Sequence, residues 1–175
     1  MKLISAITLF FLTLTFSGEP DLTKLRLWFQ NSVDNSSVAE QFYNELQTIN
    51  DSKLSPIALA YKGASICIMA KHTFSPFKKL SYLDEGMPKI NNAVKKDINN
   101  IEIRYIRYCI ESSIPSFLGK STHIDEDIDK MVTLLISSNR WQSLEKKIYK
   151  FLLEDENVSK EQKDILRTHS KEAYE

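Results

Sequence analysis

The sequence is poor in glycine and proline, and this shortage excludes several classes of protein. Four glycines and five prolines occur in 175 residues, whereas glycine alone makes up ~7% of average protein composition. Because the glycines stand far apart, at positions 18, 63, 86 and 119, no glycine-rich loop is available to cradle a phosphate. Collagen-like chains, low-complexity chains and β-sandwiches with many tight turns need more glycine or proline than this.

An excess of charge of either sign is also absent. Lysine and arginine total 23, aspartate and glutamate total 23, and 42% of the residues are hydrophobic. A nucleic-acid-binding surface needs a concentrated basic face, but the lysine pairs at 78–79, 95–96 and 146–147 are separated by acidic residues. We therefore expect a folded chain with no nucleic-acid partner.

The residues that most often carry catalysis or bind metals are few and scattered. His72, His123 and His169 are distant from one another, and the sequence contains no Cys-x-x-Cys, nucleophile elbow or zinc-protease motif. The acidic runs at 125–129 and 154–156 fit the ends of helices better than a general acid–base pair. We therefore expect a protein that is not an enzyme and holds no metal or cofactor.

The first 18 residues have the order of a secretory signal peptide. A basic start at Met1-Lys2 is followed by an uncharged apolar run, Leu3–Phe16, by the small residue Ser17 and by polar residues from Glu19 onward. This run is shorter than the ~20 residues of a membrane-spanning helix, although a membrane anchor or a buried strand is the alternative. We expect residues 19–175 to form a single domain without a membrane span, in the periplasm or outside the cell.

The remaining sequence predicts an all-α fold of about eight antiparallel helices with short loops. Capping residues stand at Asp21, Ser55, Ser75, Asn100 and Ser159, before apolar residues at helical spacing. We expect helices after Asp21 and from Ser36, and over 57–71, 77–96, 101–113, 125–137, 140–153 and 160–173. Gly86 and Pro88 predict a kink or a break within 77–96.

A weak repeat relates two of these helices. Ile57-x-x-x-Tyr61 corresponds to Ile101-x-x-x-Tyr105, 44 residues later, and each helix precedes a loop with phenylalanine and proline. Two-helix units of this length are typical of helical solenoids, whose units stack to bury their apolar faces. The alternatives are therefore a short solenoid of stacked hairpins and an irregular bundle.

Two segments resemble a tetratricopeptide unit: Ala-Leu-Ala-Tyr-Lys-Gly-Ala at 58–64 and Asn-Ala-Val-Lys-Lys-Asp-Ile-Asn-Asn at 92–100. The resemblance covers roughly residues 56–138 and implies a protein-binding scaffold. It also implies that Gly63 or Ala64, and Gly86 with Ala93, are the small residues at which helices touch. Ile98 stands where that family has proline, and the unit is about ten residues longer than the usual 34. The 60–64 and 100–105 segments are also similar to secreted helical proteins of Bacteroidetes-type bacteria, which implies no activity.

Cys67 and Cys109 are the only cysteines, and both fall within apolar predicted helices. In an oxidising compartment they could form a structural disulfide. If the two helices are equivalent members of a repeat, however, the side chains point apart, which favours two buried small apolar residues.

The run Arg104-Tyr-Ile-Arg-Tyr108 is the most distinctive polar feature. Arg104 and Arg107 lie on one side of a helix, and guanidinium groups flanked by tyrosine suit a carboxylate or a peptide terminus. The candidate binding groove comprises Tyr61, Lys62, Arg104, Tyr105, Arg107 and Tyr108. Alternatively, both arginines are internal and pair with Glu102, Glu111 or the acidic turn at 125–129.

The sequence thus predicts a secreted or periplasmic helical module that binds a protein or peptide. The first alternative is a helical carrier with an internal cavity for a lipid or small apolar ligand. The second is an enzyme, which a convergent cluster of titratable groups in a cleft would favour. A concave polar groove lined by Arg104 and Tyr105 would favour protein or peptide binding, and a large apolar pocket would favour the carrier.

Overall fold

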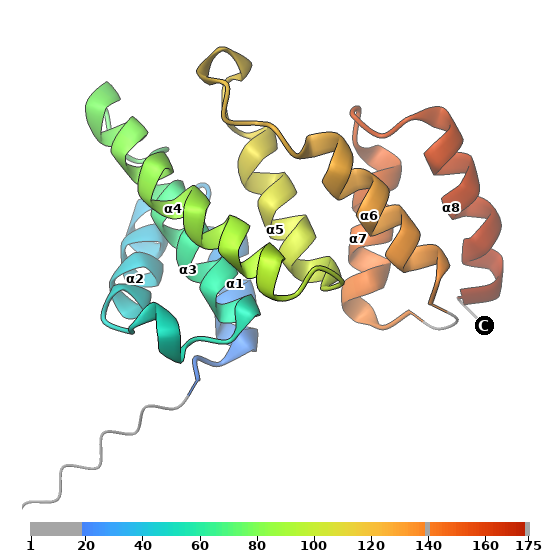
Figure 1. The fold of residues 1–175 in the computed structure, drawn as a ribbon, viewed down its shortest axis with the longest axis horizontal. Coiled ribbons are helices and arrows are strands. Elements are labelled where there is room, and N and C mark those ends of the chain that lie inside the picture. Colours follow the sequence, from blue (N-terminus) through green and yellow to red (C-terminus); the bar gives the residue numbers. More distant parts are fainter. Residues whose placement is uncertain (1–18, 139–140, 174–175) are drawn as a thin grey trace, which may run out of the picture.

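A computed structural model describes residues 19–138 and 141–173, and side chains as far as residue 170. Within these residues the chain forms helices and no strands (Figure 1), which confirms the all-α prediction. The proposed signal peptide lies outside the described residues. The α-helices are α1 (Leu22–Ser32), α2 (Ser36–Gln47), α3 (Pro56–Met69), α4 (Pro76–Lys96), α5 (Ile101–Ser112), α6 (Ile124–Ile136), α7 (Ser143–Glu154) and α8 (Lys160–Ala173), with short 3₁₀ turns η1 (Asp51–Lys53) and η2 (Ser116–Leu118).

Most helices begin where capping residues predict. The Asp21 carboxylate accepts the Thr23 N–H at 2.8 Å, and the Asn100 side chain accepts two backbone N–H groups at the start of α5. Ser55 and Ser75 cap α3 and α4, each followed by proline. Because these caps satisfy N–H groups that the helix cannot satisfy itself, they fix its first residue.

The start predicted for α7 is wrong. The helix begins at Ser143 rather than at Arg140, which lies outside the described residues. Trp141 precedes the helix, is 3% exposed, and donates its indole N–H to the Leu135 carbonyl at 3.0 Å. Trp141 is therefore buried within the connection between α6 and α7, which it holds against the end of α6. Its spacing from the apolar residues of α7 nevertheless resembles the spacing within a helix.

Of the kink or break predicted within α4, the break is wrong, because the helix passes through Gly86 and Pro88 without interruption. Pro88 and Asp84, whose carbonyl loses its helical N–H partner to the proline, lie on the exposed side of α4, where water can satisfy that carbonyl. Gly86 faces α3. A methyl group added to Gly86 would lie 2.6 Å from the Gly63 carbonyl oxygen, and one added to Gly63 would lie 2.7 Å from the Gly86 carbonyl oxygen. The backbones of α3 and α4 therefore touch at these glycines, as expected.

Two apolar cores meet at α5. The first is built from α1 to α5 and includes Phe42, Leu59 and Ile106, while the second joins Tyr108 of α5 to α6, α7 and α8. Figure 1 shows α5 between the group α1–α4 and the group α6–α8. The central helix thus contributes one face to each core, and the region where the two groups adjoin contains the candidate site.

Candidate functional site

Arg104 and Arg107, the arginines of the predicted groove, point inward to α6. Arg107 donates from Nε to Asp127 Oδ2 at 2.7 Å and from Nη2 to Asp127 Oδ1 at 2.7 Å, while Arg104 Nη1 reaches Asp127 Oδ1 at 3.1 Å. Both arginines also donate to Glu126. Arg104, Arg107 and Asp127 are 6%, 3% and 0% exposed, so these groups are internal. Both arginines pair with the acidic turn at 125–129, which was one of the partners named in the alternative to a binding groove.

The network holds α5 and α6 together electrostatically. Burial alone would lower the pKa of Arg107, but the adjacent Asp127 carboxylate outweighs burial and raises it. The hydrogen bond from Arg104 lowers the pKa of Glu126. These charges are matched to one another, and the guanidinium groups are occupied by the chain's own carboxylates.

The other residues of the predicted groove do not share one surface. The Lys62 ammonium is buried, donating to the Ile49 carbonyl at 2.6 Å and pairing with Asp51 at 2.8 Å. The Tyr108 hydroxyl donates to Asp155 at 2.6 Å within the second core. Only Tyr61 and Tyr105 of the six line a common feature, which is a pocket between the two groups of helices.

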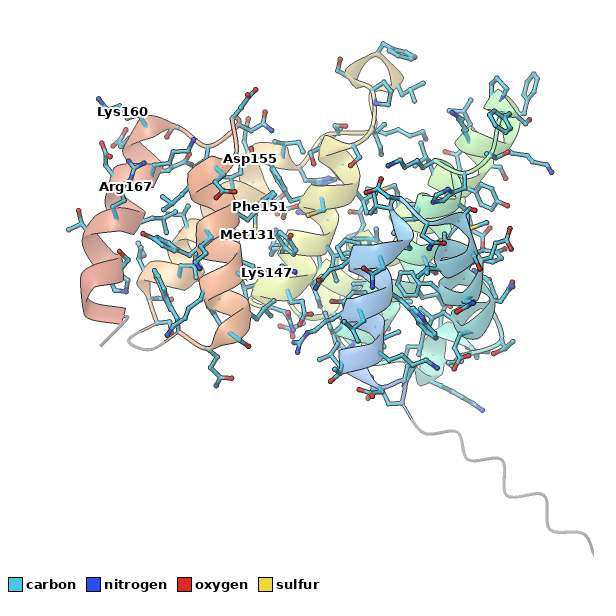
Figure 2. All side chains as sticks on the ribbon, turned by 180° about the vertical axis from the view of Figure 1, so that it is seen from behind. Met131, Lys147, Phe151, Asp155, Lys160 and Arg167 are labelled. Atoms are coloured by element: carbon cyan, nitrogen blue, oxygen red, sulfur yellow. The ribbon has the colours of Figure 1, made fainter. Side chains whose placement is uncertain are left out.

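This pocket, which we call the α1–α5 pocket, has a volume of about 1010 Å³ and is half-enclosed. Its walls come from α1, α3, α4 and α5, with η2 and the first residues of α7 completing it. The lining is mostly apolar and includes Phe29, Val33, Ile68, Leu80, Leu83, Tyr105, Ile110, Ile114, Leu118 and Leu144. Figure 2 shows Lys147 and Phe151 on the side of α7 that faces α5, where Phe151 packs edge-on against Tyr105 at 5.1 Å between ring centroids.

A polar cluster closes one part of this wall. Arg26 donates two hydrogen bonds of 2.7 Å to the Glu102 carboxylate, and the Tyr61 hydroxyl donates to the same carboxylate at 2.6 Å. Glu102 is 5% exposed. The hydrogen bonds that Arg26 donates to the Glu102 carboxylate raise the pKa of Arg26, and burial raises the pKa of Tyr61. The three side chains therefore satisfy one another, and they join α1, α3 and α5 at a polar part of the pocket wall.

Both cysteines lie in the pocket wall, Cys67 on α3 and Cys109 on α5, and both are free thiols. The structure thus has no bond between them, as expected for two small apolar residues. Burial raises the pKa of each thiol to about 12, so both remain neutral at physiological pH and add to the apolar character of the wall.

Cationic side chains line the mouth of the pocket. Lys71, Lys79 and Lys147 are exposed members of its lining. Lys71 pairs with Asp34 at 2.9 Å, whereas Lys79 and Lys147 have no ion-pair partner within residues 19–138 and 141–170. An apolar interior with cations at its edge suits a molecule with a long apolar body and a negatively charged head.

Reasoning from the sequence identified two of the lining residues, Tyr61 and Tyr105, and missed the rest. Leu80, Leu83 and Ile114 have the helical spacing of ordinary core residues, so no local signal separates the pocket wall from the core. The exposed pair Phe74 and Phe117, in corresponding loops of the proposed repeat, was the one available sign that this end of the molecule leaves apolar surface uncovered.

Among the described side chains, no three histidine, cysteine, aspartate or glutamate residues are grouped so that they could hold a metal ion. Over the same part of the chain, no helix is both long and apolar enough to cross a membrane. No protein-family model, curated protein or solved structure was found that matches this chain.

Proposed function

We propose that this protein binds a ligand with a long apolar body and an anionic head, such as a fatty acid, in the α1–α5 pocket. The observation that carries the proposal is the half-enclosed apolar pocket of about 1010 Å³, at the upper end of the roughly 300–1,000 Å³ of small-molecule sites. This is the carrier function that the sequence left as its alternative. The candidate polar groove does not favour the scaffold, because its arginines are occupied by Asp127 and Glu126.

The chemistry of the lining supports a ligand with two unlike ends. Phe29, Leu83 and Ile114 offer only dispersion and hydrophobic contact. Lys79 and Lys147 stand at the edge of the pocket, where they can reach a carboxylate that remains partly hydrated. The apolar body would be buried while the head stays at the mouth, so neither part would be left without a suitable environment.

A second candidate is an amphipathic segment of a protein partner, which retains the scaffold function predicted from the sequence. The observation that favours it is the open side of the pocket, where Val33, Leu80 and Phe117 are exposed. A helix could place its apolar face in such an opening. Native mass spectrometry of the protein from its own cells separates the candidates: a bound fatty acid adds a small mass that organic solvent extracts, whereas a partner adds a second polypeptide.

The proposal is tested by narrowing the pocket with a single side chain. Ser113 is exposed at the end of α5 and lines the pocket, whereas its neighbour Ser112 is also exposed and does not line it. Both hydroxyls donate to the Cys109 carbonyl, so Ser112→Trp is a matched control. In fluorescence titrations with dansyl-undecanoate, we expect Ser113→Trp to weaken binding about tenfold or more and Ser112→Trp to bind as the unsubstituted chain does. Equal binding by all three proteins would contradict the proposed location.

The position of the anionic head is tested by reversing charges on α7. Lys147 lines the pocket, and Lys150, exposed on the same helix, does not. We expect Lys147→Glu to weaken the binding of dansyl-undecanoate severalfold and Lys150→Glu to leave it unchanged at moderate salt. If both reversals weaken binding equally, only the net charge of the protein matters and the head has no defined place.

A further inference from the structure

Three phenylalanines at one end of the molecule are almost fully exposed. Phe74 is 101% exposed, and Phe77 and Phe117 are each 85% exposed. Phenylalanine is among the residues most often buried, so three such side chains on one end of a folded chain need a reason outside its own core.

These side chains come from two separate segments that project at the same end. Phe74 precedes α4 and Phe77 is in its first turn, while Phe117 is in η2. Figure 1 shows the start of α4 and the η2 segment both projecting at the top of the view, with α4 running diagonally down across α3. The two segments also meet at the α1–α5 pocket, since Pro76 and Leu80 of α4 and Phe117 of η2 all line it.

Lysines accompany the phenylalanines at this end. Lys78 and Lys79 follow Phe77 directly, are exposed, and lack an ion-pair partner within the described part of the chain. Lys120 follows Phe117 and pairs with Asp84. We call Phe74, Phe77, Phe117, Lys78 and Lys79 the rim. It combines side chains suited to the apolar part of a lipid layer with side chains suited to its charged surface.

We propose that the rim is a docking surface for a lipid bilayer that carries anionic headgroups. Phenylalanines on separate projecting segments present no continuous face that a rigid protein could match, whereas a bilayer accommodates each ring individually. The two adjacent lysines supply the complementary charge, because each basic residue near an anionic leaflet adds to attraction. Docking this way would place the mouth of the α1–α5 pocket against the lipid.

That placement gives the rim a role in exchanging ligand with the membrane, a role that rests on the proposed function. A fatty acid leaving the bilayer would enter the pocket beside Pro76 and Phe117, which line it, without crossing water. Membrane docking itself does not depend on any ligand, so the two proposals can fail separately.

The test is co-sedimentation of residues 19–175 with vesicles of phosphatidylcholine alone and of phosphatidylcholine with phosphatidylglycerol. Phe74→Ser with Phe77→Ser removes two rim side chains that do not line the pocket. Ile98→Ser with Ile165→Ser removes two exposed apolar residues, 55% and 43% exposed, away from the rim and is the matched control. We expect the rim variant to bind anionic vesicles about tenfold or more weakly, and the control to bind like the unsubstituted chain.

Anionic vesicles should bind more tightly than neutral ones, with the difference shrinking as salt is raised. Equal binding to both compositions would overturn the assignment of an anionic surface. Failure of the unsubstituted chain to bind either kind of vesicle would overturn membrane docking, and so would an equal loss of vesicle binding in the rim and control variants. The rim would then be assigned to a protein partner. Titration of the rim variant with dansyl-undecanoate in the absence of vesicles measures ligand binding in the pocket alone. Its result therefore tests the proposed function and not membrane docking.

Discussion

Helices α3 and α4 touch through Gly63 and Gly86, whereas α5 and α6 are joined by two arginines and Asp127. The first contact is made of backbone and small apolar side chains, with no space left for a methyl group. The second contact adds three buried charged groups, each with a partner, to the apolar side chains that the two helices share. A weak sequence repeat relates these two hairpins, with an irregular bundle as the alternative, and their interfaces use different chemistry.

The difference shows what each contact tolerates. A backbone contact fails when volume is added, because the interior is close-packed and neither helix can yield. A buried ion pair fails when one partner is removed, because the remaining charges stay buried without compensation. The hairpins should therefore respond differently to substitution, and three variants test this from the largest effect to the smallest.

Asp127→Ala should produce the largest loss. It leaves Arg104 and Arg107, 6% and 3% exposed, with only the exposed Glu126 as a carboxylate partner. We expect the free energy of unfolding to fall by about 3–5 kcal/mol, the range for breaking a buried pair. Urea denaturation followed by circular dichroism measures the change. A loss below about 1 kcal/mol would mean that α5 and α6 are held by their apolar contacts instead.

Gly86→Ala should cost less. The added methyl would lie 2.5 Å from Cys67 Sγ and 2.6 Å from the Gly63 carbonyl oxygen, and such overpacking costs about 1–3 kcal/mol. Helix propensity works in the opposite direction, favouring alanine by about 1 kcal/mol. A net loss of stability in thermal unfolding would therefore show that the contact outweighs propensity.

Gly119→Ala is the control for Gly86→Ala, because it adds the same methyl group at a position with no close neighbour. Gly119 has φ of +62° and nothing within 4 Å of an added methyl, so its cost is conformational, about 1–2 kcal/mol. A stabilised Gly86→Ala protein would contradict close contact between α3 and α4.

Glu126→Gln should have the smallest effect, because the Glu126 side chain is 55% exposed while Asp127 beside it is fully buried. We expect a loss of about 1 kcal/mol or less at pH 7. The pKa of Glu126 is lower in the folded chain than in the unfolded chain. Its stabilisation is therefore present above the unfolded pKa and is lost as the pH falls through the folded value. The difference between the two proteins should shrink from pH 7 to pH 3, and a constant difference would assign the loss to packing.

Local features of the sequence predicted local features of the fold. Asp21 and Asn100 marked helix starts because a cap acts on its own helix. The resemblance to a tetratricopeptide unit implied contact at Gly63 or Ala64 and at Gly86 with Ala93, and the backbones touch at the two glycines. Trp141 misled the prediction for α7, since a buried residue before a helix has the same apolar signal as one inside it.

The candidate site depended on tertiary arrangement and could not be predicted in this way. Whether Arg104 faces a ligand or Asp127 depends on where α6 lies, and the sequence left both possibilities open. Leu80 and Ile114 became pocket walls because no helix covers the space between the two groups. That uncovered space is a property of how helices pack, and no spacing within one helix encodes it.

The most direct test of the account is calorimetric titration of residues 19–175 with dodecanoate and with dodecanol. A pocket with an apolar interior and cationic mouth predicts one dodecanoate bound per chain, with dodecanol bound more weakly because it has no charge for Lys79 and Lys147. Absence of binding by either compound, or many weak equivalent sites for both, would contradict the claim that this pocket is a specific site for an apolar anion.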